Sequence, residues 1–467
     1  MTRTHGFFPT RKVLASAPGA ILSGALAATL VISGTGHDVT TYRATLTAAS
    51  NPVTPGNFTG FGFDQCQAPS QGAMDKWLRK SPYFAVGIYI SGKSRGCRNQ
   101  TYLNASWVHT QLSKGWKLLP ITLGPQASCQ PRFPRYGDDP TINPKTGNLY
   151  QKARAMGRTE AGRTVSAATR LGLVKGSVMY YDLEGFTYSN KNCRESAMWF
   201  LSAWTKKLHQ LGYKSGVYSS AASGIKALDR KRTNKPKAFV LPDQVWIADW
   251  DGKAGTSSTY VSDAGWSGHR RVKQYQGGHN EKWGGVTINV DRDYVDVGTG
   301  SVAPNVSHCG GTRVNFSYYP AVHPPQGSKV PNPAYVKALK CLLKERGSFP
   351  GGNMSGKYGP GLRTAIEDWQ RKHGFTVTPI FGRKNWMSLF AANGHPLVKR
   401  GSASEAVRDL QRALNAVSPD NKLSVTGNFE FFSQQALIRY QKSIGGAGSG
   451  LGNPSTWKAL AAGRFKK

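Results

Sequence analysis

Short apolar runs alternate with helical patterns between residues 58 and 298. Eight runs have the composition of buried strands, at residues 60–64, 84–90, 116–123, 177–184, 214–218, 244–251, 271–276 and 287–294. Apolar residues at helical spacing predict helices over 73–79, 107–114, 157–173 and 195–211. Nearly continuous apolar strands are typical of a parallel sheet that is buried on both faces. The pattern therefore predicts a TIM-type (β/α)8 barrel, a fold of ~250 residues.

The C-terminal part repeats one hydrophobic pattern at an offset of 71 residues, without a gap. Val336, Leu339 and Leu343 lie on one face of a helix, and the offset joins them to Val407, Leu410 and Leu414. The same offset joins further pairs: Gly356 with Gly427, Ala365 with Ala436, Trp369-Gln370 with Tyr440-Gln441, and Trp386 with Trp457. We expect two small all-α three-helix modules, at 333–394 and 396–465, after a Pro/Gly-rich linker at 299–332.

The N-terminal segment has the features of an export signal. Arg3, Arg11 and Lys12 precede an uncharged apolar stretch at 13–33. Cleavage near Ala48 would release a mature chain, whereas an uncleaved helix of this length could span a bilayer of ~30 Å. We expect a signal peptide or N-terminal anchor at 1–48 and a linker at 49–57. The protein is then secreted and cell-wall associated, with membrane contact only if the segment stays uncleaved.

The charge balance favours polyanionic partners. Lys and Arg number 61 against 25 Asp and Glu, a formal net charge of +36. For an exported chain, anionic envelope polymers fit this charge better than nucleic acid, and we expect no nucleic-acid partner. Hydrophobic residues make up 39% of the chain, which excludes a disordered protein.

Six cysteines in an exported chain predict disulfides: Cys66, Cys97, Cys129, Cys193, Cys309 and Cys341. The sequence leaves their connectivity open, although a Cys309–Cys341 bond would staple the first module to its linker. No CxxC or HExxH motif occurs, so we expect no metal site and no cofactor.

Acidic residues recur where the predicted strands end, which is where barrel enzymes place catalytic groups. Asp64 ends the first run, Asp182 and Glu184 the fourth, and Asp249 and Asp251 the sixth. Asp291 and Asp293 lie in the eighth run. In a chain with only 25 acidic residues this placement is selective.

Asp182 and Glu184 are two residues apart, so a strand would direct both toward one face. Their Cα atoms would lie roughly 6.6 Å apart. Glycoside hydrolysis uses such a carboxyl pair, one protonated and one ionised, and crowding separates their pKa values. The alternative is a helix cap or a salt-bridge partner at a strand end. Nearby aromatic residues that could stack on sugars are Tyr180, Tyr181, Trp250 and Tyr275.

The order of motifs along the predicted barrel resembles Chalaropsis-type lysozymes: G-F-D at 62–64, D-x-E at 182–184, W-I-A-D-W at 246–250, K-Q-Y-Q at 273–276 and V-D-x-D at 290–293. Residues 62–70 are also similar to the actinobacterial glycoside-hydrolase-like family, which shares the barrel. The resemblance implies that Glu184 is the acid/base, that Asp182 orients a substrate N-acetyl group, and that Asp64 and Asp291 support them. We expect substrate contacts from Tyr180, Asp249, Trp250, Asp251, Gln274 and Tyr275. Gln65-Cys66-Gln67 replaces a serine-rich segment of the lysozymes.

The repeated pattern V-x-x-L-x-x-x-L, G-x-[FY], A-x-x-x-[WY]-Q and W-x-x-L resembles the peptidoglycan-binding-domain family of bacterial wall hydrolases. The resemblance implies peptidoglycan or a related wall glycan as partner. The first copy departs from the family at Lys340, where the second copy has Gln411, and Ser355 and Thr426 replace an aspartate.

Three functions are consistent with these observations. The first is an exported glycosidase that cleaves peptidoglycan strands and is held on them by the repeats. The second is a non-catalytic wall-binding protein that uses the barrel cleft as a lectin site. The third is an envelope protein that binds polyanions.

Overall fold

The computed structural model describes residues 50–130, 132, 139–234, 236–352, 354–392 and 394–466. The predicted signal peptide or anchor at 1–48 lies outside the described residues. Within the described ranges, no helix combines the length and the hydropathy that a membrane span requires. Asn51–Lys467 forms one compact unit.

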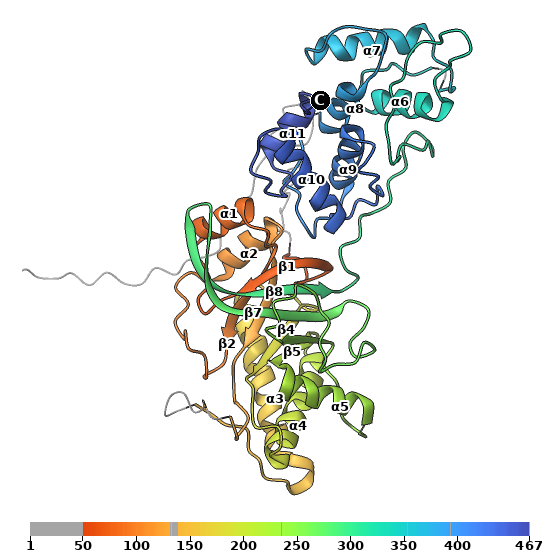
Figure 1. Ribbon diagram of the computed structural model, residues 1–467. Coiled ribbons are helices and arrows are strands. Elements are labelled where there is room, and N and C mark those ends of the chain that lie inside the picture. The colour runs from red at the N-terminus through yellow and green to blue at the C-terminus, as the bar shows by residue number, and fades with distance from the viewer. Residues whose placement is uncertain are drawn as a thin grey trace, which may run out of the picture. The chain divides into compact units, whose positions relative to one another are not determined.

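Eight strands form a closed barrel in the order of the sequence, which confirms the predicted barrel (Figure 1). The strands are β1 (Phe58–Asp64), β2 (Ala85–Ser91), β3 (Lys117–Thr122), β4 (Val178–Leu183), β5 (Lys214–Ser220), β6 (Gln244–Ala248), β7 (Arg270–Trp283) and β8 (Val286–Val297). Adjacent strands from β1 to β7 are parallel. The register places Asp64, Asp182 and Ala248 toward the same end of the barrel.

The eighth strand differs from the predicted all-parallel sheet, because β8 runs antiparallel to both β7 and β1. Only Gly284 and Gly285 separate β7 from β8, and both have positive φ, 59° and 82°. A two-residue glycine turn produces a hairpin, whereas a parallel crossover needs a dozen or more residues. Figure 1 shows the pair as a long green ribbon. The hairpin brings the N-terminal half of β8 to the end of the barrel where the other strands terminate.

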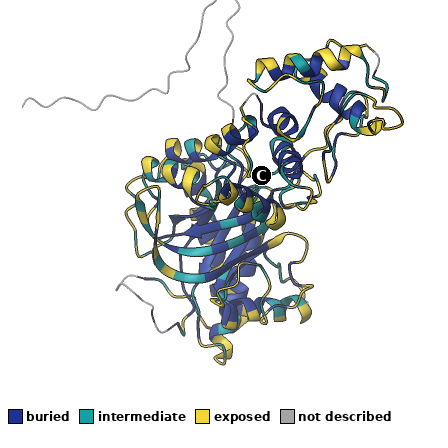
Figure 2. Cartoon of the chain, turned by 45° about the horizontal axis from the view of Figure 1, so that its top comes forward, coloured by how far each residue is buried: buried dark blue, intermediate teal, exposed yellow. Residues whose placement is uncertain are grey.

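Helices cover the outside of the barrel, and Figure 2 shows buried strands in blue beside helices with yellow exposed faces. They are α1 (Gln71–Lys80), α2 (Ala105–Ser113), α3 (Gly147–Arg170), α4 (Lys191–Gln210) and α5 (Lys226–Asn234), the last preceded by a π turn at Ala221–Ile225. Ser70, Asn104 and Asn190 cap α1, α2 and α4 by accepting a backbone N–H. These caps explain why the helices begin directly after the polar loops.

Large rings fill the barrel interior because glycines on neighbouring strands leave room for them. Tyr180 and Trp246 are fully buried and meet edge to face, with ring centroids 5.4 Å apart. A Cβ atom on Gly216 would lie 2.2 Å from Cδ1 of Tyr180. A Cβ atom on Gly87 would lie 2.5 Å from that of Asp64. Glycine at both positions therefore lets the rings pack beneath the carboxylates.

The C-terminal part consists of two three-helix modules, as predicted (Figure 1). The first contains α6 (Pro333–Glu345), α7 (Pro360–Lys372) and α8 (Arg383–Ala391), and the second contains α9 (Glu405–Val417), α10 (Phe431–Ser443) and α11 (Pro454–Ala461). Both modules share one hydrophobic core, to which Val314, Tyr319 and Val322 also belong. The predicted linker at 299–332 is thus partly built into this core.

The glutamine after the repeated aromatic residue has a structural role in both modules. Nε2 of Gln370 donates to the carbonyl oxygen of Ile380 at 2.8 Å, and Nε2 of Gln441 donates to that of Leu451 at 2.9 Å. Lys340, which departs from the family pattern, donates from Nζ to the carbonyl oxygen of Ser355 at 3.0 Å. These buried bonds fix the loops between helices, so the repeated residues specify the fold of each module.

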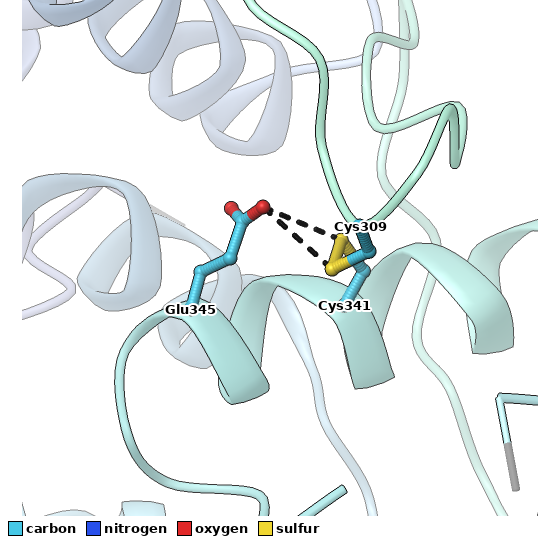
Figure 3. A group of neighbouring side chains, drawn as sticks. All are labelled: Cys309, Cys341 and Glu345. Carbon is cyan, nitrogen blue, oxygen red and sulfur yellow. Dashed lines mark hydrogen bonds between the residues drawn. A yellow bond between two sulfur atoms is a disulfide. The ribbon is translucent and has the colours of Figure 1, made fainter.

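Three disulfides join Cys66 to Cys97, Cys129 to Cys193 and Cys309 to Cys341. The last confirms the predicted staple between the first module and its linker. Figure 3 shows Glu345 beside it, with Oε1 at 3.6 and 3.7 Å from the two sulfur atoms. Although these three residues have the proximity of metal ligands, the sulfurs are bonded to each other and offer no thiolate.

A fully buried lysine attaches the second module to the barrel. Nζ of Lys399 donates to the carbonyl oxygens of Leu78 at 2.8 Å, Ser81 at 3.2 Å and Tyr83 at 2.5 Å. Ser301 adds a bond from Oγ to the carbonyl oxygen of Gly401 at 2.7 Å. Burial removes water from the ammonium group and thereby lowers the pKa of Lys399. The three carbonyl acceptors compensate in part for this loss of solvation.

We predict that Gly216→Ala destabilises the barrel by about 1–3 kcal/mol, because its methyl group overlaps the Tyr180 ring. Urea denaturation measures the free energy of unfolding. Gly72→Ala, in α1 with no atom within 4 Å of its added Cβ, is the control and should leave stability unchanged or slightly higher. Equal unfolding free energies for the two variants would show that the interior tolerates the methyl group.

Candidate active site

Strand β4 directs the D-x-E pair into the mouth of the barrel. Val178 and Tyr180 belong to the interior cluster, whereas Met179, Tyr181 and Leu183 pack outward against the helices. By the same alternation, Asp182 and Glu184 face inward. Asp182 is 1% exposed and Glu184, just beyond the end of the strand, is half-buried. The pair therefore has one carboxylate beneath the surface and one at it.

The side-chain amide of Gln126 holds the backbone around this pair. Its Nε2 donates to the carbonyl oxygen of Asp182 at 2.8 Å, and its Oε1 accepts the N–H of Glu184 at 2.9 Å. Gln126 is fully buried, and its own backbone bonds to Pro140 and Ile142. These two hydrogen bonds take the place of backbone pairing with β3, a pairing that ends at Tyr181. They fix the direction in which the chain continues from β4 to Glu184.

Asp182 lies beside two half-buried tyrosines, Tyr89 and Tyr218. The hydroxyl of Tyr89 donates to Oδ2 of Asp182 at 3.1 Å. Burial, followed by the charges of Asp182 and Asp64, raises the pKa of Tyr89. Burial, followed by the charges of Asp182 and Glu184, likewise raises the pKa of Tyr218. Both phenols stay protonated and remain hydrogen-bond donors beside the carboxylates.

Asp64, Asp291 and Asp293 form a second cluster of carboxyl side chains at the mouth of the barrel. Asp64 on β1 pairs in register with Asp291 on β8, and Asp293 pairs with Gly62, two residues before Asp64. Burial, followed by the charge of Asp291, raises the pKa of Asp64 well above its usual value. Burial raises the pKa of Asp291 to about 6, and burial followed by the charge of Asp64 raises that of Asp293. This trio therefore retains protons at pH values where an ordinary aspartate has lost them.

Gln274 connects this trio to the opposite wall. Its Nε2 donates to Oδ2 of Asp64 at 2.8 Å. Its Oε1 accepts from the Tyr218 hydroxyl at 3.0 Å and from Nε1 of Trp250 at 2.8 Å. Gln274 is 2% exposed, so it positions its three neighbours from behind.

Two cavities open at this end of the barrel, and Glu184 lines both. The smaller, of about 240 Å³, is also lined by Asp64, Tyr89, Arg95 and Asp291. The larger, of about 510 Å³, is also lined by Gln130, Tyr218, Asp249, Trp250 and Tyr260. Glu184 is thus the carboxylate at the junction of a cleft with room on either side.

An exposed tryptophan forms one wall of the larger cavity. Trp250 is 65% exposed, and a Cβ atom on Gly277 would lie 2.5 Å from its ring. The ring rests on the backbone of Gly277 and is anchored through Nε1 to Gln274. A flat, exposed and fixed aromatic surface is suited to stacking on a sugar ring.

The structure brings most of the predicted site residues together. Asp64, Glu184 and Asp291 line the cleft, as do Asp249 and Trp250. Asp182 and Gln274 lie directly behind these residues.

Three predicted substrate contacts lie elsewhere. Tyr180 is fully buried against Trp246 and donates to Gln244, because it lies below the carboxylates on an inward-facing position. Asp251 pairs with Lys273 at 2.7 Å. Tyr275 is 7% exposed and lines neither cavity of the cleft. Tyr180 faces inward but lies one layer below the cleft, whereas Tyr275 follows the inward-facing Gln274 on β7 and so points to the other side of the sheet.

The site also contains residues that the sequence did not indicate. Gln126, Tyr89, Tyr218 and Arg95 come from four different segments. None of these residues belongs to a distinctive sequence motif. They come together at the cleft only because the closed barrel brings their segments to the same end. A weak signal existed for Gln126, Tyr89 and Tyr218, which lie at or just after the ends of predicted strands.

Two family models match separate parts of the chain. Residues 75–295 match an Rv2525c-like, glycoside hydrolase-like domain. Residues 332–389 and 403–460 each match a peptidoglycan binding domain. The chain thus combines an Rv2525c-like glycoside hydrolase-like domain with two peptidoglycan-binding repeats, as the motifs predicted. The two repeat matches are offset by 71 residues, which is the offset of the sequence pattern.

Several solved structures are similar to about half of the chain. The Tat-secreted protein Rv2525c of Mycobacterium tuberculosis, in complex with HEPES, is 14% identical over 51% of this chain and 96% of that chain, with a TM-score of 0.34. An uncharacterized B. stearothermophilus protein is 18% identical over 50% and 95%, with a TM-score of 0.32. The modular autolysin LytC of Streptococcus pneumoniae is 15% identical over 50% and 46%, with a TM-score of 0.31. No curated protein matches the chain.

We predict that Asp291→Asn makes stability less dependent on pH. The pKa of Asp291 is raised to about 6 from 3.8, so its favourable contribution is present below pH 3.8 and is lost as the pH rises through 6. The variant should match the wild type near pH 4 and exceed it by roughly 1–2 kcal/mol at pH 8. Urea denaturation at both pH values measures this difference.

The exposed Asp263→Asn serves as the control for the pH series. Its unfolding free energy should follow the wild type at both pH values. An Asp291→Asn variant that is less stable than the wild type at pH 8 would mean that the ionised carboxylate is favourably bound in the folded protein.

Proposed function

We propose that the barrel is a glycosidase that hydrolyses the glycan strands of peptidoglycan, with Glu184 as its general acid and base. The position of Glu184 at the junction of two cavities carries the proposal. A polymer that runs through the cleft would place one sugar in each cavity and the bond between them at Glu184. Among the cleft carboxylates described above, Glu184 lines both cavities, whereas Asp64 and Asp291 line the smaller one and Asp249 the larger.

The chemistry requires a proton for the leaving oxygen and negative charge near the anomeric carbon. In the proposed reaction Glu184 donates its proton as the C–O bond breaks. A water molecule then supplies the hydroxyl group, and its proton returns to the Glu184 carboxylate. Asp182, held by Tyr89, stabilises positive charge at the reacting carbon or orients an N-acetyl group toward it. Asp64 and Asp291, which line the smaller cavity, bind sugar hydroxyls.

The remainder of the chain supports peptidoglycan as the substrate. Two peptidoglycan-binding repeats lie in the same chain, and Lys399 fastens the second to the barrel. Holding a catalytic cleft on its polymer raises the local concentration of substrate. Three disulfides are typical of a protein that functions outside the cytoplasm, which agrees with action at the cell wall.

We predict that Glu184→Gln lowers the release of reducing ends from purified peptidoglycan by at least about 100-fold, because the amide cannot donate and recover a proton. Mass spectrometry of the released muropeptides identifies the bond. Glu367→Gln, a half-buried glutamate on α7, is the matched control and should retain wild-type release.

Sedimentation with insoluble peptidoglycan separates catalysis from binding in the same experiment. Both variants should sediment with the wall as the wild type does. If the wild type sediments but releases no sugar, the barrel is a binding domain and the catalytic proposal is wrong.

We predict that Trp250→Ala raises KM roughly tenfold with a smaller change in kcat, because the ring supplies a stacking surface away from the reacting bond. Trp250→Phe keeps a flat ring and should restore most of the affinity. The KM and kcat of the three proteins on soluble glycan strands measure the effect. A loss confined to kcat would instead place Trp250 in control of the orientation of Gln274.

A further inference from the structure

A third cavity, of about 420 Å³, lies between the end of β2 and helix α3, next to the cleft. It is lined by cationic side chains from two segments: Lys93, Arg95 and Arg98 after β2, and Arg163 and Arg170 on α3. Glu160 is the carboxylate that lines it. Arg95 also lines the smaller cavity of the cleft, so one side chain borders both spaces.

Among the described residues, the lining of this cavity contains five cationic side chains and one carboxylate, that of Glu160. Glu160 is 3% exposed and accepts from Arg163 at 3.1 Å, but burial raises its pKa. Arg98 pairs with Asp139 at 2.8 Å. Arg95 binds neutral acceptors, the carbonyl oxygens of Gly92 at 2.9 Å and Tyr89 at 3.3 Å.

The guanidinium groups also repel one another. Burial, followed by the charge of Arg98, lowers the pKa of Arg95. A negatively charged ligand in the cavity would offset the desolvation of Arg95 and would screen its repulsion from Arg98.

The loop that carries these cations is held in place on both sides. The Cys66–Cys97 disulfide ties it to the end of β1. The backbone N–H of Ser94 donates to the carbonyl oxygen of Leu123 at 3.1 Å. Gly92 has φ +101°, and a Cβ atom there would lie 2.1 Å from the same oxygen, so glycine permits this approach. The arginines are therefore positioned before any ligand arrives, which lowers the entropic cost of binding.

We propose that this cavity is an anion subsite that binds an acidic group carried by the glycan in the cleft. Guanidinium groups recognise the planar or tetrahedral oxygens of a carboxylate or a phosphate through paired hydrogen bonds. A free carboxylate of the peptide stem and a phosphate ester on the sugar share this chemistry. The subsite rests on the proposed function for the identity of the glycan, and it narrows the substrate class to strands with acidic substituents.

The test compares two double variants, both on α3, each of which removes two positive charges. Arg163→Gln/Arg170→Gln removes two cations from the cavity, whereas Lys152→Gln/Arg158→Gln removes two exposed cations of α3 that do not line it. Both pairs are made in the full chain with Glu184→Gln, which prevents turnover. Calorimetry measures binding of a disaccharide tetrapeptide with free carboxylates, of the same compound amidated, and of a 6-phosphorylated muramyl disaccharide.

We predict that the parent protein binds at least one acidic probe about tenfold more tightly than the amidated probe. Arg163→Gln/Arg170→Gln should abolish this preference, whereas Lys152→Gln/Arg158→Gln should retain it. The preference should also shrink as salt is raised. The acidic probe that shows the preference identifies the source of the anion.

The outcomes separate the subsite from the proposed function. Binding of the amidated probe reports on the glycan cleft alone, so its absence counts against the proposed function. Equal affinity for acidic and amidated probes, or a preference that both double variants retain, overturns the anion subsite. If thermal unfolding shows that Arg163→Gln/Arg170→Gln is destabilised, because Arg163 pairs with Glu160, the exposed Arg170→Gln alone carries the same comparison.

Discussion

The antiparallel closure of the barrel by β8 is the constraint on which the rest of the site depends. A barrel must pair its first and last strands, and here the last strand enters from the opposite end after a turn of two glycines. Because of this reversal, Asp291 and Asp293 lie against Asp64 on β1. Their mutual burial gives the mouth of the barrel a group of carboxyls with raised pKa values. If β8 were parallel to the other strands, its C-terminal residues would lie at the mouth of the barrel in place of Asp291.

A chain with a net charge of +36 places several of its 25 acidic residues at one end of one barrel. Hydrogen bonds from neutral groups stabilise this concentration of carboxyls: the Tyr89 hydroxyl, the Trp246 indole and the Gln274 amide. The cationic residues next to the cleft lie in a separate cavity, with Arg95 at the boundary. Because of this separation, the carboxyls at the mouth accept hydrogen bonds from neutral groups and do not pair directly with the arginines of that cavity.

In the two C-terminal modules, the repeated residues stabilise the fold of each module. The pattern residues that identify the repeats, such as Gln370 and Gln441, are buried and bond to the loops of their own module. The modules share one core with residues of the preceding segment, and Lys399 fixes the second module to the barrel. The C-terminal part is therefore packed against residues of the preceding segment and of the barrel.

The sequence by itself determined the number and order of the strands, the 71-residue repeat and the D-x-E pair on one face of β4, whereas the disulfide connectivity came from the structure. These features depend on periodicity and short-range geometry, which are properties of local sequence. Only the tertiary structure decided the direction of β8, the burial of Tyr180 and the pairing of Asp251 with Lys273. It also decided the positions of Gln126, Gln274 and Arg95 around the cleft. Contacts between strands distant in sequence exist only once the barrel is closed, so no local pattern records them.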